Sequence, residues 1–62
     1  MKVKNLIRLI EKDGGYLIQT RGSHGQFRHP IKSGTVTVAG KLGLDVPAGT
    51  LNSALKQAGL KD

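Results

Sequence analysis

The run from Arg21 to Pro30 gathers the residues that are best suited to chemistry. It contains both histidines of the chain, two of its three arginines and its only phenylalanine: Arg21, His24, Phe27, Arg28 and His29. An imidazole can accept or donate a proton at cellular pH, and a guanidinium binds phosphate oxygens. The combination suits proton transfer on a phosphate backbone.

The local pattern around His24 predicts a turn followed by a short strand. Gly22, Ser23 and Gly25 favour a turn, and Pro30 ends a strand because it cannot donate to a sheet ladder. We expect this strand at about residues 25–29.

If the chain is already extended at His24, then His24, Gln26 and Arg28 project to one face of the strand. Phe27 and His29 then project to the other face, where Phe27 seeks the core. The first face would offer an imidazole, an amide and a guanidinium to solvent. This prediction fails if His24 lies within the turn.

His24 is the candidate catalytic group, because RNA cleavage by the 2′-hydroxyl needs one positioned acid or base. Arg21, Arg28 and N–H groups of the turn at residues 22–25 can stabilise the negative charge that develops on phosphorus. A turn or hydrogen-bonding role for His24 remains open from residue types alone. Turn formation explains Ser23 better than nucleophilic attack does, and we interpret His29 as structural.

Composition indicates one small basic domain, spanning residues 1–62. Ten Lys and Arg residues against four Asp and Glu give a net charge of +6 and a pI of about 10.2. Such a balance favours polyanionic partners, of which nucleic acid is the most common, although a merely soluble basic domain is the alternative. The chain has no cysteine, so it has neither a disulfide framework nor a thiolate metal site. We expect no metal or other cofactor.

No apolar run approaches the roughly 20 residues of a membrane span, and no signal-peptide pattern opens the chain. We therefore expect a cytoplasmic protein that does not associate with membranes.

Hydrophobic periodicity predicts a helix at each end of the chain. Apolar residues recur at helical spacing from Val3 to Ile10, and the pair Gly14–Gly15 follows. A second helix is predicted to begin near Pro47 and to end at Gly59. Its stripe consists of Leu51, Ala54, Leu55 and Ala58.

Two further strands are predicted between the helices, at residues 16–21 and 35–39. In the first, Leu17 and Ile18 are adjacent, so alternation does not decide which face is buried. We interpret Tyr16 as a core or edge residue in preference to a base-stacking one. In the second, Val36 and Val38 should point inward.

The predicted architecture is an α+β two-layer sandwich in the order α-β-β-β-α. Short links make the three strands antiparallel, and the two helices cover one face of the sheet. The arrangement resembles the double-stranded RNA-binding domain. The other sheet face stays open for a site or a partner.

Two motifs are similar to those of the HicA family of toxin mRNA interferases. They are Gly-Ser-His-x-x-Phe-Arg-His-Pro at residues 22–30 and Pro-x-Gly-Thr-Leu-x-Ser-x-Leu-Lys-Gln-Ala-Gly-Leu at residues 47–60. The chain departs from the family pattern at Gly15, Gln19 and Gly25, where an aromatic, a basic residue and a second histidine are common.

The resemblance implies a metal-independent endoribonuclease that cuts mRNA as the toxin of a type II toxin–antitoxin pair. It implies that His24 is the catalytic acid or base and that a HicB-type antitoxin occludes it. We expect either a homodimer or a toxin–antitoxin hetero-oligomer. We expect the RNA contacts to come from Arg21, Gly22, Ser23, Arg28, Lys32 and Lys41.

The alternative is a non-catalytic RNA-binding module of the same fold. It would hold phosphates through Lys4, Arg8, Lys32 and Lys41. A protein-interaction domain that docks a partner on its open sheet face is a third possibility.

Overall fold

The chain folds into two helices and three strands in the predicted order. The computed structural model describes residues 1–61. The elements are α1 (Val3–Lys12), β1 (Tyr16–Arg21), β2 (His24–Arg28), β3 (Val36–Val38) and α2 (Ala48–Gln57). The α+β class and the α-β-β-β-α order are therefore confirmed.

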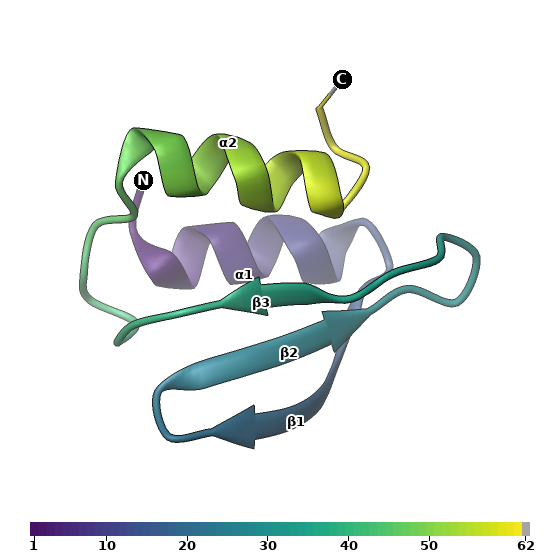
Figure 1. Ribbon diagram of the computed structural model, residues 1–62, viewed down its shortest axis with the longest axis horizontal. Coiled ribbons are helices and arrows are strands. Elements are labelled where there is room, and N and C mark those ends of the chain that lie inside the picture. Colours follow the sequence, from purple (N-terminus) through teal and green to yellow (C-terminus); the bar gives the residue numbers. More distant parts are fainter. Residues whose placement is uncertain (62) are drawn as a thin grey trace.

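The three strands form one antiparallel sheet in the order β1-β2-β3. Figure 1 shows both helices on the same side of this sheet, side by side and running in the same direction. Their N-terminal ends are tied together by a hydrogen bond from the Val46 N–H to the Met1 carbonyl at 2.8 Å. The second face of the sheet carries no helix.

The core lies between the helices and the strands β2 and β3. Its buried side chains are Val3, Leu6, Ile10, Phe27, Val36, Val38, Val46 and Ala54. Val36 and Val38 point inward as the alternation predicted. Strand β1 differs, because all six of its residues are exposed. Neither helix covers β1, so it is an uncovered edge strand.

Each helix ends in a glycine that adopts a positive φ, as predicted. Gly59 has φ of +71°, and the N–H of Leu60 then donates to the Leu55 carbonyl at 2.8 Å. The same pattern ends α1 at Gly14, with φ of +104°. The reversed backbone satisfies carbonyls that the last helical turn leaves unpaired. At Gly14, this reversal also directs the chain from α1 into β1.

An irregularity at Ile18 decides which side chains of β1 share a face. Leu17 is opposite Phe27, but the next paired residue on β1 is Gln19, which is opposite Gln26. Ile18 is therefore the extra residue of a β-bulge. Leu17 accordingly faces the same side as the buried Phe27. The neighbouring paired residues, Tyr16 and Gln19, both face the other side.

We call the uncovered side the open face. Side chains that oppose one another in the register share a face, and the open face consists of Tyr16, Gln19 and Arg21 on β1, His24, Gln26 and Arg28 on β2, and Thr37 on β3.

Some boundaries differ slightly from the predictions. Strand β2 begins at His24 and ends at Arg28, so it starts one residue earlier than expected, and β3 is shorter. Neither helix within residues 1–61 has the length and apolar character needed to cross a membrane.

Candidate functional site

His24 is the first residue of β2, and it follows a two-residue turn. Gly22 has φ of +58°, whereas Ser23 has a negative φ, which is the pattern of a hairpin turn that requires glycine first. The condition for the predicted facing of His24, Gln26 and Arg28 is met, because His24 is on the strand and not within the turn. Its side chain is exposed, and it makes no hydrogen bond to another side chain or to the backbone of residues 1–61.

Arg21 lies directly opposite His24 across the hairpin. Such cross-strand neighbours have Cβ atoms about 4.5–5.5 Å apart. Both side chains are exposed and both are on the open face. The guanidinium and the imidazole can therefore reach the same phosphate group.

The turn that carries His24 also touches the connector after β3. The Gly40 N–H donates to the Ser23 carbonyl at 3.2 Å. This contact places Lys41, the next residue, near the hairpin end of the sheet. Gly22 and Ser23 donate no backbone hydrogen bond in the described part of the chain, so their N–H groups are available to a ligand. Arg21, Gly22, Ser23, His24 and Lys41 are thus brought to one end.

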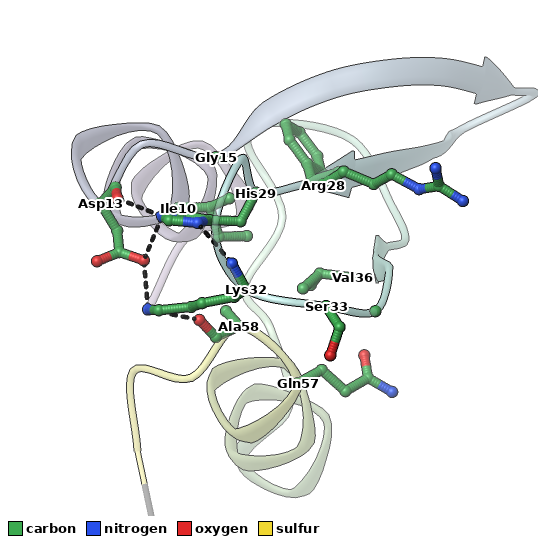
Figure 2. A pocket seen from close by; sticks show the side chains of 12 residues that line it. Ile10, Asp13, Gly15, Arg28, His29, Lys32, Ser33, Val36, Gln57 and Ala58 are labelled. Atoms are coloured by element: carbon green, nitrogen blue, oxygen red, sulfur yellow. Dashed lines mark hydrogen bonds and ion pairs between the residues drawn. The ribbon is translucent and has the colours of Figure 1, made fainter.

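Arg28 is on the open face but at the opposite end of β2. It lies four positions along the strand from His24, a distance of about 13 Å. Its Nε donates to the Thr35 hydroxyl at 3.5 Å, and the guanidinium points away from the core in Figure 2. Arg28 can contact a neighbouring phosphate of a bound strand, but not the one at His24.

The structure does not bring Lys32 to this group. Its ammonium lies 2.6 Å from Asp13 Oδ2 and 3.1 Å from the Ala58 carbonyl (Figure 2). These contacts join the ends of α1 and α2 beyond the far end of β2. The hydrogen bond from Lys32 holds the pKa of the Asp13 carboxyl below its usual value, with partial burial acting in the opposite direction. Lys32 therefore has a structural role in this fold.

His29 belongs to the same cluster (Figure 2). Its Nδ1 accepts the N–H groups of Ile31 at 3.0 Å and Lys32 at 3.1 Å. Nδ1 is therefore unprotonated, and Nε2 carries the proton that is donated to the Asp13 carbonyl at 2.8 Å. The ring shapes the loop after β2, which agrees with the structural interpretation, although it does so through hydrogen bonds and not by packing beside Phe27.

Two features of the open face go beyond the predictions. Gln19 Nε2 donates to Gln26 Oε1 at 2.6 Å, which forms an amide pair in the middle of the sheet. Tyr16 is 48% exposed on the edge strand β1 and opposite Arg28, so of the two predicted environments it has the edge one and not the core one. The bulge at Ile18 places Gln19 on the same face as Tyr16, and no local sequence signal predicts a bulge.

The electrostatic character of the open face is positive. Arg21 and Arg28 carry its charges, and none of the acids within residues 1–61 lies on it, because Glu11 and Asp13 belong to the α1 region and Asp45 to the loop before α2. In the same residues, no three His, Asp or Glu side chains gather as a potential metal site.

These observations define a class: a small basic α+β domain with an exposed histidine–arginine pair on an uncovered sheet face. The family model described as "HicA toxin of bacterial toxin-antitoxin" matches residues 3–60. The chain belongs to the HicA family and is a toxin of a toxin–antitoxin system. No curated protein sequence matches it significantly.

Proposed function

We propose that this toxin is an endoribonuclease that cleaves mRNA with His24 as its general acid or base. The observation that carries the proposal is the position of His24. It is exposed, lies at the end of a strand and is opposite Arg21, on a face where no Asp or Glu of residues 1–61 lies. A polyanionic strand can reach the imidazole there without displacing any part of the fold.

The reaction needs one protein acid or base together with phosphate-binding groups. The 2′-hydroxyl attacks the adjacent phosphorus, the bond to the 5′-oxygen breaks, and the products are a 2′,3′-cyclic phosphate and a 5′-hydroxyl. His24 either removes the proton of the 2′-hydroxyl or donates one to the leaving 5′-oxygen, and solvent water exchanges the other proton. Arg21 and the N–H groups of Gly22 and Ser23 bind the phosphate oxygens, where negative charge increases in the transition state.

Lys41 and Arg28 extend the binding surface on either side of this centre. Lys41 follows the loop that touches Ser23, and Arg28 lies at the other end of the open face. Lys32 is not included among the RNA contacts, because its ammonium is engaged with Asp13. The proposed binding face is therefore the sheet, with the helices on the far side.

The open face is also where a protein partner would block the toxin. A HicB-type antitoxin that covers the open face would shield His24 and Arg21 together and so block access of RNA in the cytoplasm. This assembly requires no change in the toxin fold, because both residues are already exposed.

The test compares the purified toxin with a His24→Ala variant on a long RNA in the presence of a chelator. We expect fragments with cyclic phosphate ends from the toxin and intact RNA from the variant. Fragments from both proteins alike would reject His24 as the catalytic group, whether another residue or a contaminating nuclease cuts the RNA, and binding without cleavage by either would favour the RNA-binding module.

A further inference from the structure

The amide pair of Gln19 and Gln26 occupies the centre of the open face. The two residues are directly opposite each other, and Gln26 is also opposite Thr37 on β3. This polar row lies between the row of Arg21 and His24 and the row of Tyr16 and Arg28. Adjacent rows are two residues apart along β2, which corresponds to roughly 6.6 Å.

The pair leaves hydrogen-bonding groups free on the solvent side. Gln19 uses one N–H on Gln26 Oε1 and keeps its own carbonyl oxygen and a second N–H. Gln26 keeps both of its N–H groups. If the oxygen and nitrogen positions of both amides were interchanged, Gln26 would donate to Gln19, and the same number of donors and acceptors would remain free. The pair thus offers an acceptor beside donors, held in place by a short hydrogen bond.

We propose that Gln19 and Gln26, together with Tyr16, form a subsite for one base of the bound RNA, with adenine preferred over guanine. The proposal rests on the proposed function, since that function places the strand on this face. An amide that offers an acceptor and a donor matches the N6 amino group and a ring nitrogen of adenine. Guanine presents two acceptors, O6 and N7, at the corresponding edge, so the free Gln19 carbonyl oxygen would find no donor there.

Tyr16 supplies the aromatic surface that such a subsite requires. It is 48% exposed and shares the open face with Gln19, because the bulge at Ile18 places both residues on the same side. Base stacking on an exposed aromatic ring tolerates any base and adds affinity. Tyr16 therefore contributes binding, whereas the two amides contribute the choice of base.

The two rows that flank the amide pair determine which nucleotide of the RNA carries this base. A phosphate at Arg21 and His24 and a second phosphate at Arg28 are separated by the amide row. The base read by Gln19 and Gln26 then belongs to a nucleotide next to the scissile phosphate. Cleavage would consequently be favoured at a fixed offset from an adenine.

Binding measurements test the subsite independently of cleavage. The probes are two fluorescent heptanucleotides, UUUAUUU and UUUGUUU, and the protein is the His24→Ala variant, which leaves the oligonucleotides intact. We expect the adenine probe to bind roughly tenfold more tightly than the guanine probe. The Gln19→Leu and Gln26→Leu double variant should bind both probes equally.

A matched control is Gln57→Leu, which makes the same chemical change at an exposed position of α2, on the opposite side of the sheet from the open face. It should keep the tenfold preference. If the double variant does not fold, the single Gln19→Leu change at an exposed position carries the test, with folding checked by circular dichroism. Tyr16→Ala should weaken both probes by a similar factor.

Equal binding of the two probes by the His24→Ala protein would overturn the subsite, as would a preference that survives loss of both amides. A preference that depends on the amides, found together with a wild-type protein that cleaves no RNA, would uphold the subsite and reject the nuclease. The two proposals can therefore fail separately.

Discussion

Arg21 and His24 oppose each other across the β1–β2 hairpin, and the bulge at Ile18 lets Arg21 share a face with Tyr16. In a regular strand, Tyr16 and Arg21 would point to opposite faces, because they are five positions apart and side chains alternate between faces at each position. The extra residue gathers the cationic, amide and aromatic side chains of β1 on the side where His24 is exposed. Bulges near active sites commonly re-aim side chains in this way.

Replacing Arg21 tests whether this pairing matters for cleavage. Arg21→Gln removes the cation that we place on the reacting phosphate, and we expect kcat/KM to fall by roughly 100-fold. Arg8→Gln is the control, since Arg8 is equally charged but exposed on α1. Equal losses for the two variants, measured with a labelled RNA, would show that Arg21 contributes only general positive charge.

His29→Ala should reduce stability more than activity. The variant leaves the N–H groups of Ile31 and Lys32 and the Asp13 carbonyl without their partner. We expect a loss of about 1–3 kcal/mol in the free energy of unfolding. Thermal melts and turnover, compared at a temperature where both proteins are folded, would reveal swapped roles if turnover fell and the melt did not.

The Asp13 carboxylate should make stability depend on pH in the acidic range. Its pKa is lowered in the folded state, chiefly by the hydrogen bond from Lys32. The folded protein therefore holds this proton less tightly than the unfolded chain does, so the contribution is complete above the unfolded pKa of 3.8 and is lost as pH falls through the lower folded value.

Urea unfolding at pH 6 and pH 3 measures this contribution. The wild type should lose more stability between the two values than Asp13→Asn does, while the other carboxyls titrate equally in both proteins. A parallel decline of wild type and variant would mean that the Asp13–Lys32 contact contributes nothing to folding.

Gly15 packs so closely against the end of α1 that a side chain has no room there. A Cβ at this position would lie 2.6 Å from Ile10 Cγ2 and 2.9 Å from the Ile10 carbonyl oxygen. Gly15→Ala should destabilise the fold by about 1–3 kcal/mol. Gly49→Ala, at an open position within α2, should not destabilise it, because alanine favours helix. Equal denaturation midpoints for the two variants would contradict this contrast.

Local patterns predicted the elements well. Helical spacing gave α1, the glycines Gly14 and Gly59 ended the helices, and alternation oriented Val36 and Val38. The turn before β2 could be predicted because Gly22 and Ser23 are turn formers, although the strand begins one residue earlier than expected, at His24. These features depend on neighbours in the sequence, so the sequence alone carries them.

The arrangement of β1 and the place of Lys32 depend on partners that are distant in the sequence. Nothing in the run from Tyr16 to Arg21 marks Ile18 as a bulge, and Lys32 meets Asp13 across 19 residues and Ala58 across 26. In the sequence alone, Lys32 is a loop lysine that could bind RNA, whereas in the fold its ammonium is paired with the Asp13 carboxylate. The amide pair of the open face could not be predicted either, because it also depends on a partner in another strand.

The proposed nuclease function depends most on the proton transfer assigned to His24, and the single-turnover rate of RNA cleavage measures this transfer directly. With enzyme in excess and chelator present, His24→Ala should cleave roughly 10²–10⁴-fold more slowly than the wild type, while it binds the RNA with similar affinity. A variant that cleaves at the wild-type rate would contradict the account.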